Sequence, residues 1–406
     1  MSEWKKVKLK DCCHSISDGD HLPPPKSNSG VPFVTIANID ATNHIDFGNT
    51  MFVPLEYYNN LNDIRKAKCN DILYSVVGSF GKPVLIKENI PFAFQRHIAI
   101  LRPNNEIADS RFLYYVMLTR DFFMQADTVA IGAAQRTISL TALRNMEVKL
   151  PSMETQYRIA NILSRYDSLI ENYQKQIKLL EEAAQRLYKE WFIDLHFPGH
   201  ENTKIVDGLP EGWEKKTIAD VCTNISSGST PSRSNKAYWE NGTIKWVKTK
   251  ELQDGWILDT EEYISQEGYN SSSTKMFPVN TILMAIYASP TLGRLGILST
   301  DCCCNQAALG LIADENIISW QWLFWKLYEL RDEFNAIARG AGQQNISGIV
   351  VKNKEIIIPD KGVIDGFTSV VSKMFEQQKS LSSQLRLLTE ARDRLLPKLM
   401  SGEITV

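Results

Sequence analysis

The chain contains 406 residues with a formal net charge of −2, and 43% of its residues are hydrophobic and 23% charged. These ordinary fractions exclude a long disordered chain, and the length predicts two or three domains. The near-zero net charge excludes a uniformly basic nucleic-acid-binding protein. Any contact with DNA would therefore depend on local patches of charge.

Neither a secretory signal nor a membrane-spanning segment is predicted. The N-terminal stretch MSEWKKVKLKDCC lacks an apolar region, and the apolar run NTILMAIYA (280–288) is too short to cross a bilayer. The seven cysteines include no CxxC pair, and neighbours in the runs CC (12–13) and CCC (302–304) would point to opposite faces of a strand. We therefore expect a cytoplasmic protein with no membrane contact, no bound metal and reduced, buried thiols.

The first 150 residues predict a strand-rich domain. Short apolar runs (VPFVTIANI, DILYSVV and AFQRHIAIL) are separated by clusters of Gly, Pro and Asn, as is typical of an α+β fold. The aromatic run RFLYYVML (111–118) predicts one buried helix.

A long helix is expected after Pro151, with Ser152 as its N-cap. Apolar residues then recur at alternating spacings of four and three, the pattern of a coiled-coil seam. The predicted seam residues are Ile159, Leu163, Tyr166, Ile170, Tyr173, Ile177, Leu180, Ala184, Leu187 and Trp191.

After the passage DLHFPGHENTK (194–204), the chain repeats the same plan. LKDCCHSISDG (9–19) matches IADVCTNISSG (218–228), RFLYY (111–115) matches QWLFW (321–325), and GAAQRTIS (132–139) matches GAGQQNIS (340–347). A second seam lies 208 residues after the first: Phe367, Val371, Met374, Gln378, Leu381, Leu385, Leu388, Arg392, Leu395 and Leu399. The chain is therefore two copies of one unit, and the polar members Gln378 and Arg392 are expected to fix the register of the seam.

The two long helices are expected to pair antiparallel. The end of the first helix then lies beside the start of the second, whereas a parallel pair would force the linker back along roughly 60 Å of helix. The predicted fold is an α+β protein with two strand-rich globular domains, an antiparallel coiled coil and a pseudo-twofold internal repeat, in which a rod carries one domain at each end. The predicted parts are residues 1–151 (first domain), 152–200 (first helix and linker), 201–358 (second domain) and 359–406 (second helix).

Two related but unequal domains suit a target with two separated, unequal halves, and double-stranded DNA is such a target. The segment 228–250 interleaves five basic and three aromatic residues against the single acidic residue Glu240, and this composition can grip phosphates and stack on bases. Core tryptophans and solvated lysines are the alternative interpretation. Residues 205–358 hold fourteen basic and eighteen acidic residues, so the charges would have to be segregated by face.

The candidate DNA-binding residues come from both copies. They are Lys26, Arg65, Lys66, Lys82, Arg96, His97 and Arg136 in the first copy, and Thr230, Arg233, Lys236, Tyr238, Trp246, Lys248, Tyr287, Arg294, Gln306 and Gln344 in the second. The repeated phrase around Gln135 and Gln343 is interpreted as a tight turn held by a glutamine, although a glutamine amide can also read adenine. Because both copies keep this phrase, we expect the residues that read sequence to lie where the copies differ.

No catalytic site is predicted. The chain contains no GxxxxGK[ST] phosphate loop and no Asn/Asp-Pro-Pro-aromatic string. Glu147 and Lys149 resemble a nuclease pair, but the second copy has Ile357 in place of the lysine. DGDH (18–21) corresponds to SGST in the second copy, which indicates a variable loop, and the strand around His97 favours a packed or DNA-contacting histidine over a general base.

The chain resembles the specificity subunit of type I restriction-modification systems over essentially its whole length. The motifs that carry the resemblance are SSGSTPSRSNKAYWENGTIKWVKTKEL, GAGQQNIS before IIIP, LPSMETQYRIANIL and RLLPKLMSGEI. No single motif is highly specific, but their order, which occurs twice in the chain, is. It implies a non-catalytic subunit in which two target-recognition domains each read half of a bipartite DNA sequence, and the helices set the gap. The second helix lacks a counterpart of Gln156, which argues against equal contacts with two partner subunits.

The resemblance also implies partners and cofactors. Two modification subunits would methylate adenine N6 with S-adenosylmethionine, and restriction subunits would use ATP and Mg, so this chain itself would bind no cofactor. A coiled-coil scaffold whose two heads bind protein or glycan is the alternative function, motivated by the acidic second domain.

Overall fold

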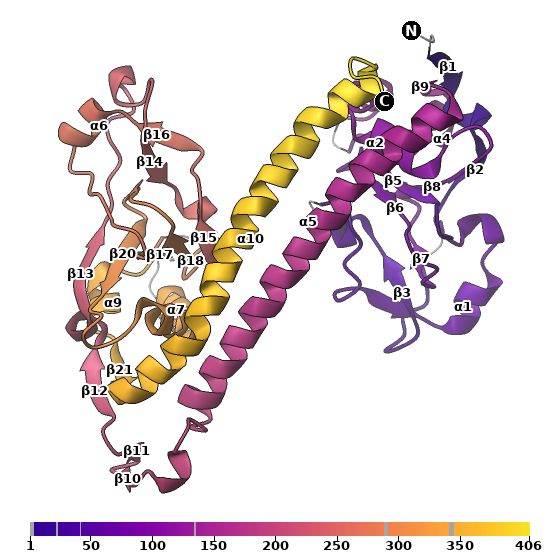
Figure 1. Cartoon of the computed structure of the whole chain (residues 1–406). Helices are drawn as coiled ribbons and strands as arrows, with labels where there is room; N and C mark the ends of the chain where they lie inside the picture. The colour runs from indigo at the N-terminus through magenta and orange to yellow at the C-terminus, as the bar shows by residue number, and fades with distance from the viewer. Residues whose placement is uncertain (1–3, 22, 41, 134, 288–290, 341–344) are drawn as a thin grey trace. The chain divides into compact units, whose positions relative to one another are not determined.

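The computed structural model describes residues 4–21, 23–40, 42–133, 135–287, 291–340 and 345–406 (Figure 1). The chain divides into two compact units, residues 1–170 with 388–406 and residues 171–387. Each unit contains one globular head and a part of both long helices. In the described part, no helix has the length and apolar character needed to cross a bilayer.

The first head contains nine strands and four short α-helices in the described residues. The strands are β1 (Lys5–Lys8), β2 (Cys13–Asp18), β3 (Val31–Val34), β4 (Met51–Val53), β5 (Ile72–Ser75), β6 (Pro83–Leu85), β7 (Ala93–Phe94), β8 (Ile98–Pro103) and β9 (Glu147–Leu150). The helices are α1 (Leu55–Asn60), α2 (Ser110–Leu118), α3 (Arg120–Val129) and α4 (Leu140–Asn145).

The second head repeats this series after a short β-hairpin of β10 (Ile205–Val206) and β11 (Leu209–Pro210). Its strands are β12 (Glu214–Thr217), β13 (Cys222–Ser227), β14 (Ile244–Val247), β15 (Gly255–Ile257), β16 (Glu262–Ile264), β17 (Ile282–Ala285), β18 (Leu295–Leu298), β19 (Cys303–Cys304), β20 (Ala308–Ala313) and β21 (Glu355–Ile358). Its helices are α6 (Gln266–Asn270), α7 (Trp320–Glu329), α8 (Arg331–Gly340) and α9 (Gly348–Lys352).

The sheet topologies of the two heads confirm the internal repeat. The central sheets have the orders β2-β8-β5-β6 and β13-β20-β17-β18-β15, and the small sheets have the orders β4-β3-β7 and β16-β14-β19. The register shifts at equivalent places, between Cys13 and Ser15 and between Cys222 and Asn224. Strand β15, which pairs parallel with β18, has no counterpart among the described residues of the first head.

Each central sheet is covered on both faces, and this explains why its middle strands are continuous apolar runs. In β5, Ile72 and Tyr74 pack in the cluster with α2, whereas Leu73 packs with the small sheet. In β17, Ile282 and Met284 likewise face α7, and Leu283 faces the opposite cluster. Successive residues of a strand point to opposite faces, so one apolar run supplies two cores.

The matched glycines Gly19 and Gly228 lie where the chain crosses directly over the small sheet. A Cβ atom added to Gly19 would lie 2.1 Å from the carbonyl oxygen of Phe94, and one added to Gly228 would lie 2.1 Å from that of Cys304. Both obstacles are backbone atoms, so they cannot move aside as a flexible side chain would. Only glycine fits this crossing, which is why both copies have it.

Replacing Gly228 by alanine is therefore expected to lower the free energy of unfolding of the second head by about 1–3 kcal/mol, because the added methyl group overpacks the crossing. Urea unfolding followed by tryptophan fluorescence measures this loss. The control is Gly255→Ala, since a Cβ atom there meets nothing within 4 Å. Equal losses in both variants would show that the crossing does not set the requirement for glycine.

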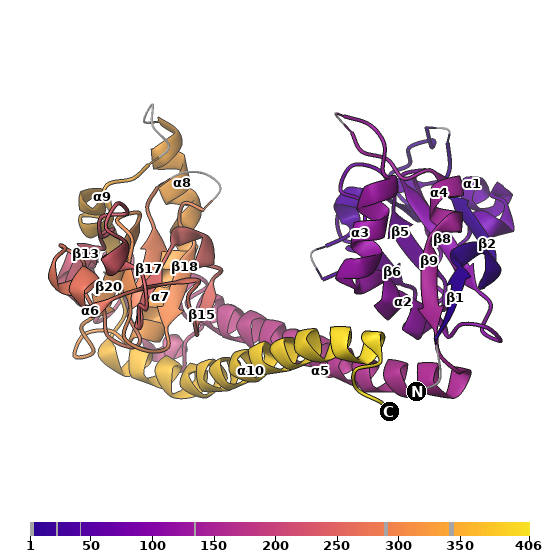
Figure 2. The ribbon, with the colours of Figure 1, turned by 90° about the horizontal axis from the view of Figure 1, so that it is seen from above.

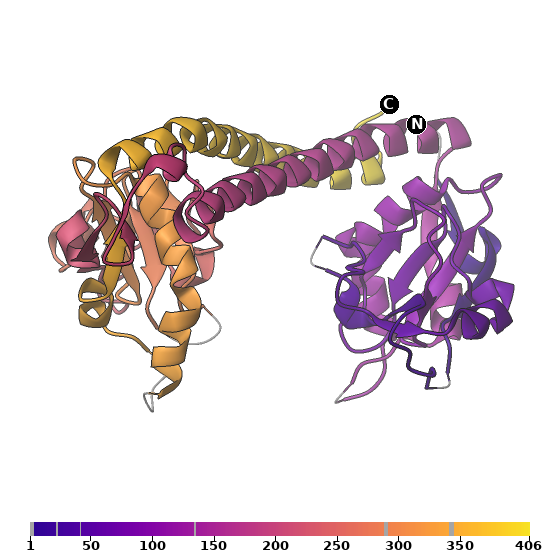
Figure 3. The same cartoon turned by 90° about the horizontal axis from the view of Figure 1, so that it is seen from below.

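The long helices are α5 (Met153–Tyr188) and α10 (Lys361–Ser401). In the first unit, Ile159 and Leu163 near the start of α5 share a cluster with Leu399 near the end of α10. In the second unit, Ala184 near the end of α5 shares a cluster with Phe367 near the start of α10. The helices therefore pair antiparallel within each unit, as their ribbons show from above and below (Figure 2 and Figure 3).

Every predicted seam residue is buried or half-buried. The polar member Arg392 forms an ion pair with Asp167 of α5 at 2.9 Å, and the hydroxyl group of Tyr115 donates to the same carboxylate at 2.6 Å. Gln378 is 8% exposed. Because Tyr115 belongs to α2, Asp167 links the helix pair to the first head.

Gln156 does not have the partner-contacting role that the sequence comparison of the two helices indicated. Its side chain is 1% exposed, and its carbonyl oxygen accepts from the backbone N–H of Asp109 at 3.0 Å. Its amide group donates to the carbonyl oxygens of Ile107 and Pro151. Gln156 therefore fastens the first head to its own helix, and the equivalent residue Ile364 is a buried core residue in the second unit.

Candidate nucleic-acid interface

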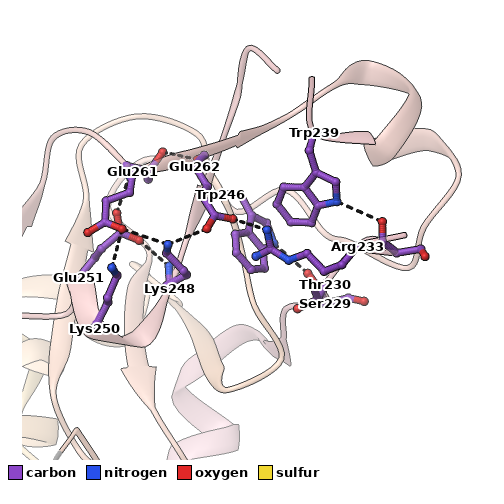
Figure 4. Close-up of polar contacts among 12 residues, drawn as sticks. Ser229, Thr230, Arg233, Trp239, Trp246, Lys248, Lys250, Glu251, Glu261 and Glu262 are labelled. Carbon is purple, nitrogen blue, oxygen red and sulfur yellow. Dashed lines mark hydrogen bonds and ion pairs between the residues drawn. The ribbon is translucent and has the colours of Figure 1, made fainter. Parts of the chain in front are cut away.

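The basic and aromatic segment of the second head is organised around Arg233 (Figure 4). The guanidinium carbon lies 3.6 Å from the ring centroid of Trp239 and 4.9 Å from that of Trp246, and the guanidinium group forms an ion pair with Glu262 at 2.6 Å. Trp246 is 2% exposed and donates to the carbonyl oxygen of Ser229. Trp246 is therefore a core residue that supports Arg233, and its buried ring is not available to stack on a base.

Lys248 lies beside this group in a network of opposite charges (Figure 4). Its ammonium nitrogen lies 2.8 Å from Glu262 and 3.0 Å from Glu261, and Lys250 lies 2.5 Å from Glu261. The hydrogen bond to Glu262, followed by that to Glu261, raises the pKa of Lys248. Lys250 and Lys248 lower the pKa of Glu261, and Lys248 and Arg233 lower that of Glu262 against the opposing effect of its partial burial.

These ion pairs change the interpretation of segment 228–250. The segment itself contains one acidic residue, but β14 pairs antiparallel with β16, which places Glu262 opposite Trp246. Carboxylates from outside the segment therefore offset the charge of Lys248, Lys250 and Arg233. Strand register, which composition does not encode, brings them together.

In the first head, Arg65 lies in a comparable network at the end of β2. Its guanidinium group is 3.5 Å from Asp20 and 3.8 Å from Asp18, and His21 is 2.7 Å from Asp18. The hydroxyl group of Tyr57 donates to Asp20, and burial, followed by this hydrogen bond, raises the pKa of Tyr57. The predicted variable loop 18–21 is thus an ordered polar cluster.

Three further cations of the first head bind groups of the head itself. Lys66 donates to the carbonyl oxygen of Asn59 at 2.9 Å, Lys82 donates to that of Ile39 at 3.4 Å, and Arg136 forms an ion pair with Asp127 and lies over the ring of Phe80. These interactions hold loops together, so the three cations are at least partly engaged within the head.

Arg96 and His97 meet in a surface cleft of about 320 Å³. The other side chains and backbone segments that line the cleft are Asp18, Val76, Val77, Gln135, Thr137, Ile138, Ser139 and Leu140. Arg96 is exposed and His97 half-buried. The structure therefore brings two of the predicted residues together with Gln135, which the sequence predicts to hold a tight turn.

The remaining candidates of the second head lie on or near its surface. Tyr287 is 40% exposed, Lys236 and Gln306 are exposed, and Tyr238, Arg294 and Thr230 are half-buried. The hydroxyl group of Thr230 donates to the side-chain oxygen of Gln306. Lys26 of the first head is exposed, and Gln344 lies outside the described residues.

Within the described ranges, no group of three or more His, Cys, Asp or Glu residues could hold a metal ion. Cys302, Cys303 and Cys304 are fully buried free thiols, and burial raises the pKa of Cys303 to about 12. Burial of all three thiols disfavours the thiolate form, which nucleophilic attack and metal binding require.

Each unit carries one strand-rich head packed on antiparallel parts of the two long helices, and the two heads share one plan, so the chain is a duplicated α+β protein with paired helices. Comparison with known proteins identifies the family: residues 1–182 and 210–381 match the type I restriction modification DNA specificity domain, and the chain belongs to this family.

Individual relatives agree with this assignment. The chain is 29% identical over 305 residues to the type I restriction enzyme MjaIX specificity subunit of Methanocaldococcus jannaschii, covering 73% of this chain and 69% of the relative. It is 25% identical over 476 residues to the HindI specificity subunit of Haemophilus influenzae, with both chains fully covered. The crystal structure of an S subunit from M. genitalium has the same fold, with a TM-score of 0.66, 17% identity, and coverage of 98% of this chain and 96% of that one.

Proposed function

We propose that this chain is the DNA specificity subunit of a type I restriction-modification complex. Each head would bind one half of a bipartite double-stranded target, and the paired helices would set the distance between the halves. The observation that carries this proposal is the duplicated head, in which the central and small sheets repeat one strand order apart from the added strand β15, together with the antiparallel packing of the long helices in each unit, in a chain of the specificity family.

The proposed role is recognition without catalysis by this chain. Modification subunits would supply adenine N6 methylation with S-adenosylmethionine, and restriction subunits would supply ATP- and Mg-dependent cleavage. The family match favours this function over a scaffold whose heads bind protein or glycan.

The test is a footprinting experiment with the full chain in complex with its modification subunit. We expect protection of two short DNA tracts separated by an unread gap, because two separate heads contact the DNA. We also expect binding to weaken steeply as salt rises, since each neutralised phosphate makes the slope of log K against log salt more negative by about 0.9. One continuous protected tract, or binding that is insensitive to salt, would contradict the proposal and favour the scaffold.

A further inference from the structure

Four backbone segments meet at the same end of the central sheet in each head. We call these segments the rim. In the first head the rim comprises residues 18–21, 76–77, 95–97 and 135–138, and in the second head it comprises residues 227–230, 286–287, 305–307 and 345–346. The cleft that contains Arg96 lies on the rim of the first head.

The backbone of the rim is the same in both heads. Four backbone hydrogen bonds of the first rim recur in the second, each from an N–H group to a carbonyl oxygen. In the first rim they run from Val76 to His97 (2.9 Å), Ile138 to Val76 (2.8 Å), Gly19 to Ile98 (3.2 Å) and Asp20 to Phe94 (3.0 Å). Their equivalents, in the same order, run from Ile286 to Ala307 (2.9 Å), Ile346 to Ile286 (3.0 Å), Gly228 to Ala308 (3.2 Å) and Ser229 to Cys304 (3.0 Å). Exposure also repeats, because residues 96 and 306 are exposed and both neighbours of each are half-buried. The two rims are therefore one frame used twice.

The side chains on this frame differ completely in charge. Apart from Arg136, whose equivalent Gln344 lies outside the described residues, the ionisable residues of the first rim are Asp18, Asp20, His21, Arg96 and His97, and the equivalent positions of the second rim carry Ser227, Ser229, Thr230, Gln306 and Ala307. At these matched positions, five ionisable groups of the first rim correspond to five uncharged groups of the second rim. Since the frame is constant, the chemistry of these side chains determines what each rim can bind.

The first rim contains two arginines: Arg96 is exposed, whereas Arg136 is half-buried and paired with Asp127. In the part of the chain that the structure describes, no hydrogen bond or ion pair engages its guanidinium group, whereas the nearby carboxylates Asp18 and Asp20 are held by Arg65. A guanidinium group with this freedom can donate two parallel hydrogen bonds to O6 and N7 of a guanine in the major groove.

Gln306 occupies the same place on the second rim. Its side-chain oxygen accepts from the hydroxyl group of Thr230, and this hydrogen bond fixes the orientation of the amide. The second lone pair of the oxygen and the NH₂ group remain for a ligand. This donor and acceptor pair matches N6 and N7 of an adenine.

We propose that positions 96 and 306 are equivalent base-reading positions, with Arg96 reading a guanine in one half-site and Gln306 an adenine in the other. This inference rests on the proposed function, because it assigns residues to the recognition of each half-site. It also goes beyond that function by stating which base each rim selects.

The experiment uses the full chain in complex with its modification subunit and a DNA target whose two half-sites have been mapped with the wild-type complex. Binding is then measured for every single-base-pair substitution in both half-sites. The Arg96→Gln variant is expected to lose roughly 5- to 150-fold discrimination at one guanine of one half-site and to favour adenine there. The Gln306→Arg variant is expected to show the reverse change at one adenine of the other half-site.

Controls at the far end of each head separate this role from general effects. Lys10 and Lys215 are exposed and lie before the starts of β2 and β13, whereas the rim lies at the ends of these strands. Lys10→Gln and Lys215→Gln should leave discrimination unchanged at every base. Because positions 96 and 306 are exposed, circular dichroism is expected to show unchanged folding for all four variants.

Three outcomes would overturn the inference. The variants at positions 96 and 306 could weaken binding equally on every sequence, which indicates phosphate contacts. They could leave discrimination unchanged, or both could act in the same half-site. In each case the wild-type complex would still protect two tracts, so the proposed function would survive. Absence of any sequence-specific protection by the wild type would instead reject the proposed function itself.

Discussion

Replacing Phe367 by alanine is expected to lower the free energy of unfolding of the second unit by about 3–5 kcal/mol, because it leaves a large cavity in a packed core. Phe367 is fully buried, and its ring centroid lies 5.0 Å from that of Phe192 and 6.1 Å from those of Tyr188 and Trp191. This aromatic cluster joins the end of the first helix to the start of the second.

Tryptophan fluorescence during urea unfolding isolates this effect, because eight of the nine tryptophans lie within residues 171–387 and only Trp4 lies outside. The matched control is Val370→Ala, one turn along the same helix, where the side chain is 43% exposed. The control should change the unfolding free energy by no more than about 0.5 kcal/mol. A loss below 1 kcal/mol for Phe367→Ala would show that the helices do not depend on this junction.

Exchanging the second head for that of a relative is expected to replace one half-site and leave the other intact. The structural reason is that each head begins and ends on a pair of adjacent strands, β1 with β9 (Lys5↔Leu150) and β12 with β21 (Glu214↔Ile358). The chain therefore enters and leaves the head at one place. Replacing the residues between those strands keeps the helices and the first head unchanged.

Binding to the original target should fall by roughly 10³-fold or more, because each of several mismatched base pairs costs about 1–3 kcal/mol. DNA that carries the original first half-site and the new second half-site should be bound as tightly as the wild-type target. As a control, seven residues inserted into both helices at matched positions should alter the gap and neither half-site. A change in both half-sites after one exchange would show that the heads do not recognise DNA independently.

The sequence predicted the repeated architecture well, because both the repeat and the spacing of apolar residues can be seen by comparing the chain with itself, without knowing which residues meet in space. The seam spacing located both long helices and their buried faces, and the phrase beginning at Gly132 was correctly treated as structural in its backbone. Its residues Thr137 and Ile138 bond to the chain after β5, and Ser139 accepts from the N–H of Ala142 as the N-cap of α4. The same cap recurs at Ser347 of the second copy.

The candidate site was predicted less completely, because charge balance across a sheet depends on register. Arg233 and Lys248 were selected for their basic surroundings, yet Glu261 and Glu262 reach them from the neighbouring strand. Gln135 was assigned to a turn, yet it lines the cleft with Arg96 and His97. Gln156 was linked to partners, yet it is buried in the first unit.

The sequence alone determined that this protein is a duplicated α+β domain with two long amphipathic helices, because hydrophobic periodicity and self-similarity follow directly from the order of residues. Tertiary structure decided which cations are already paired and which polar groups share one end of a sheet. Such groups are far apart along the chain, for example Asp18, Arg96 and Gln135. Their proximity depends on strand order and register, which arise only when the sheets and helices pack together.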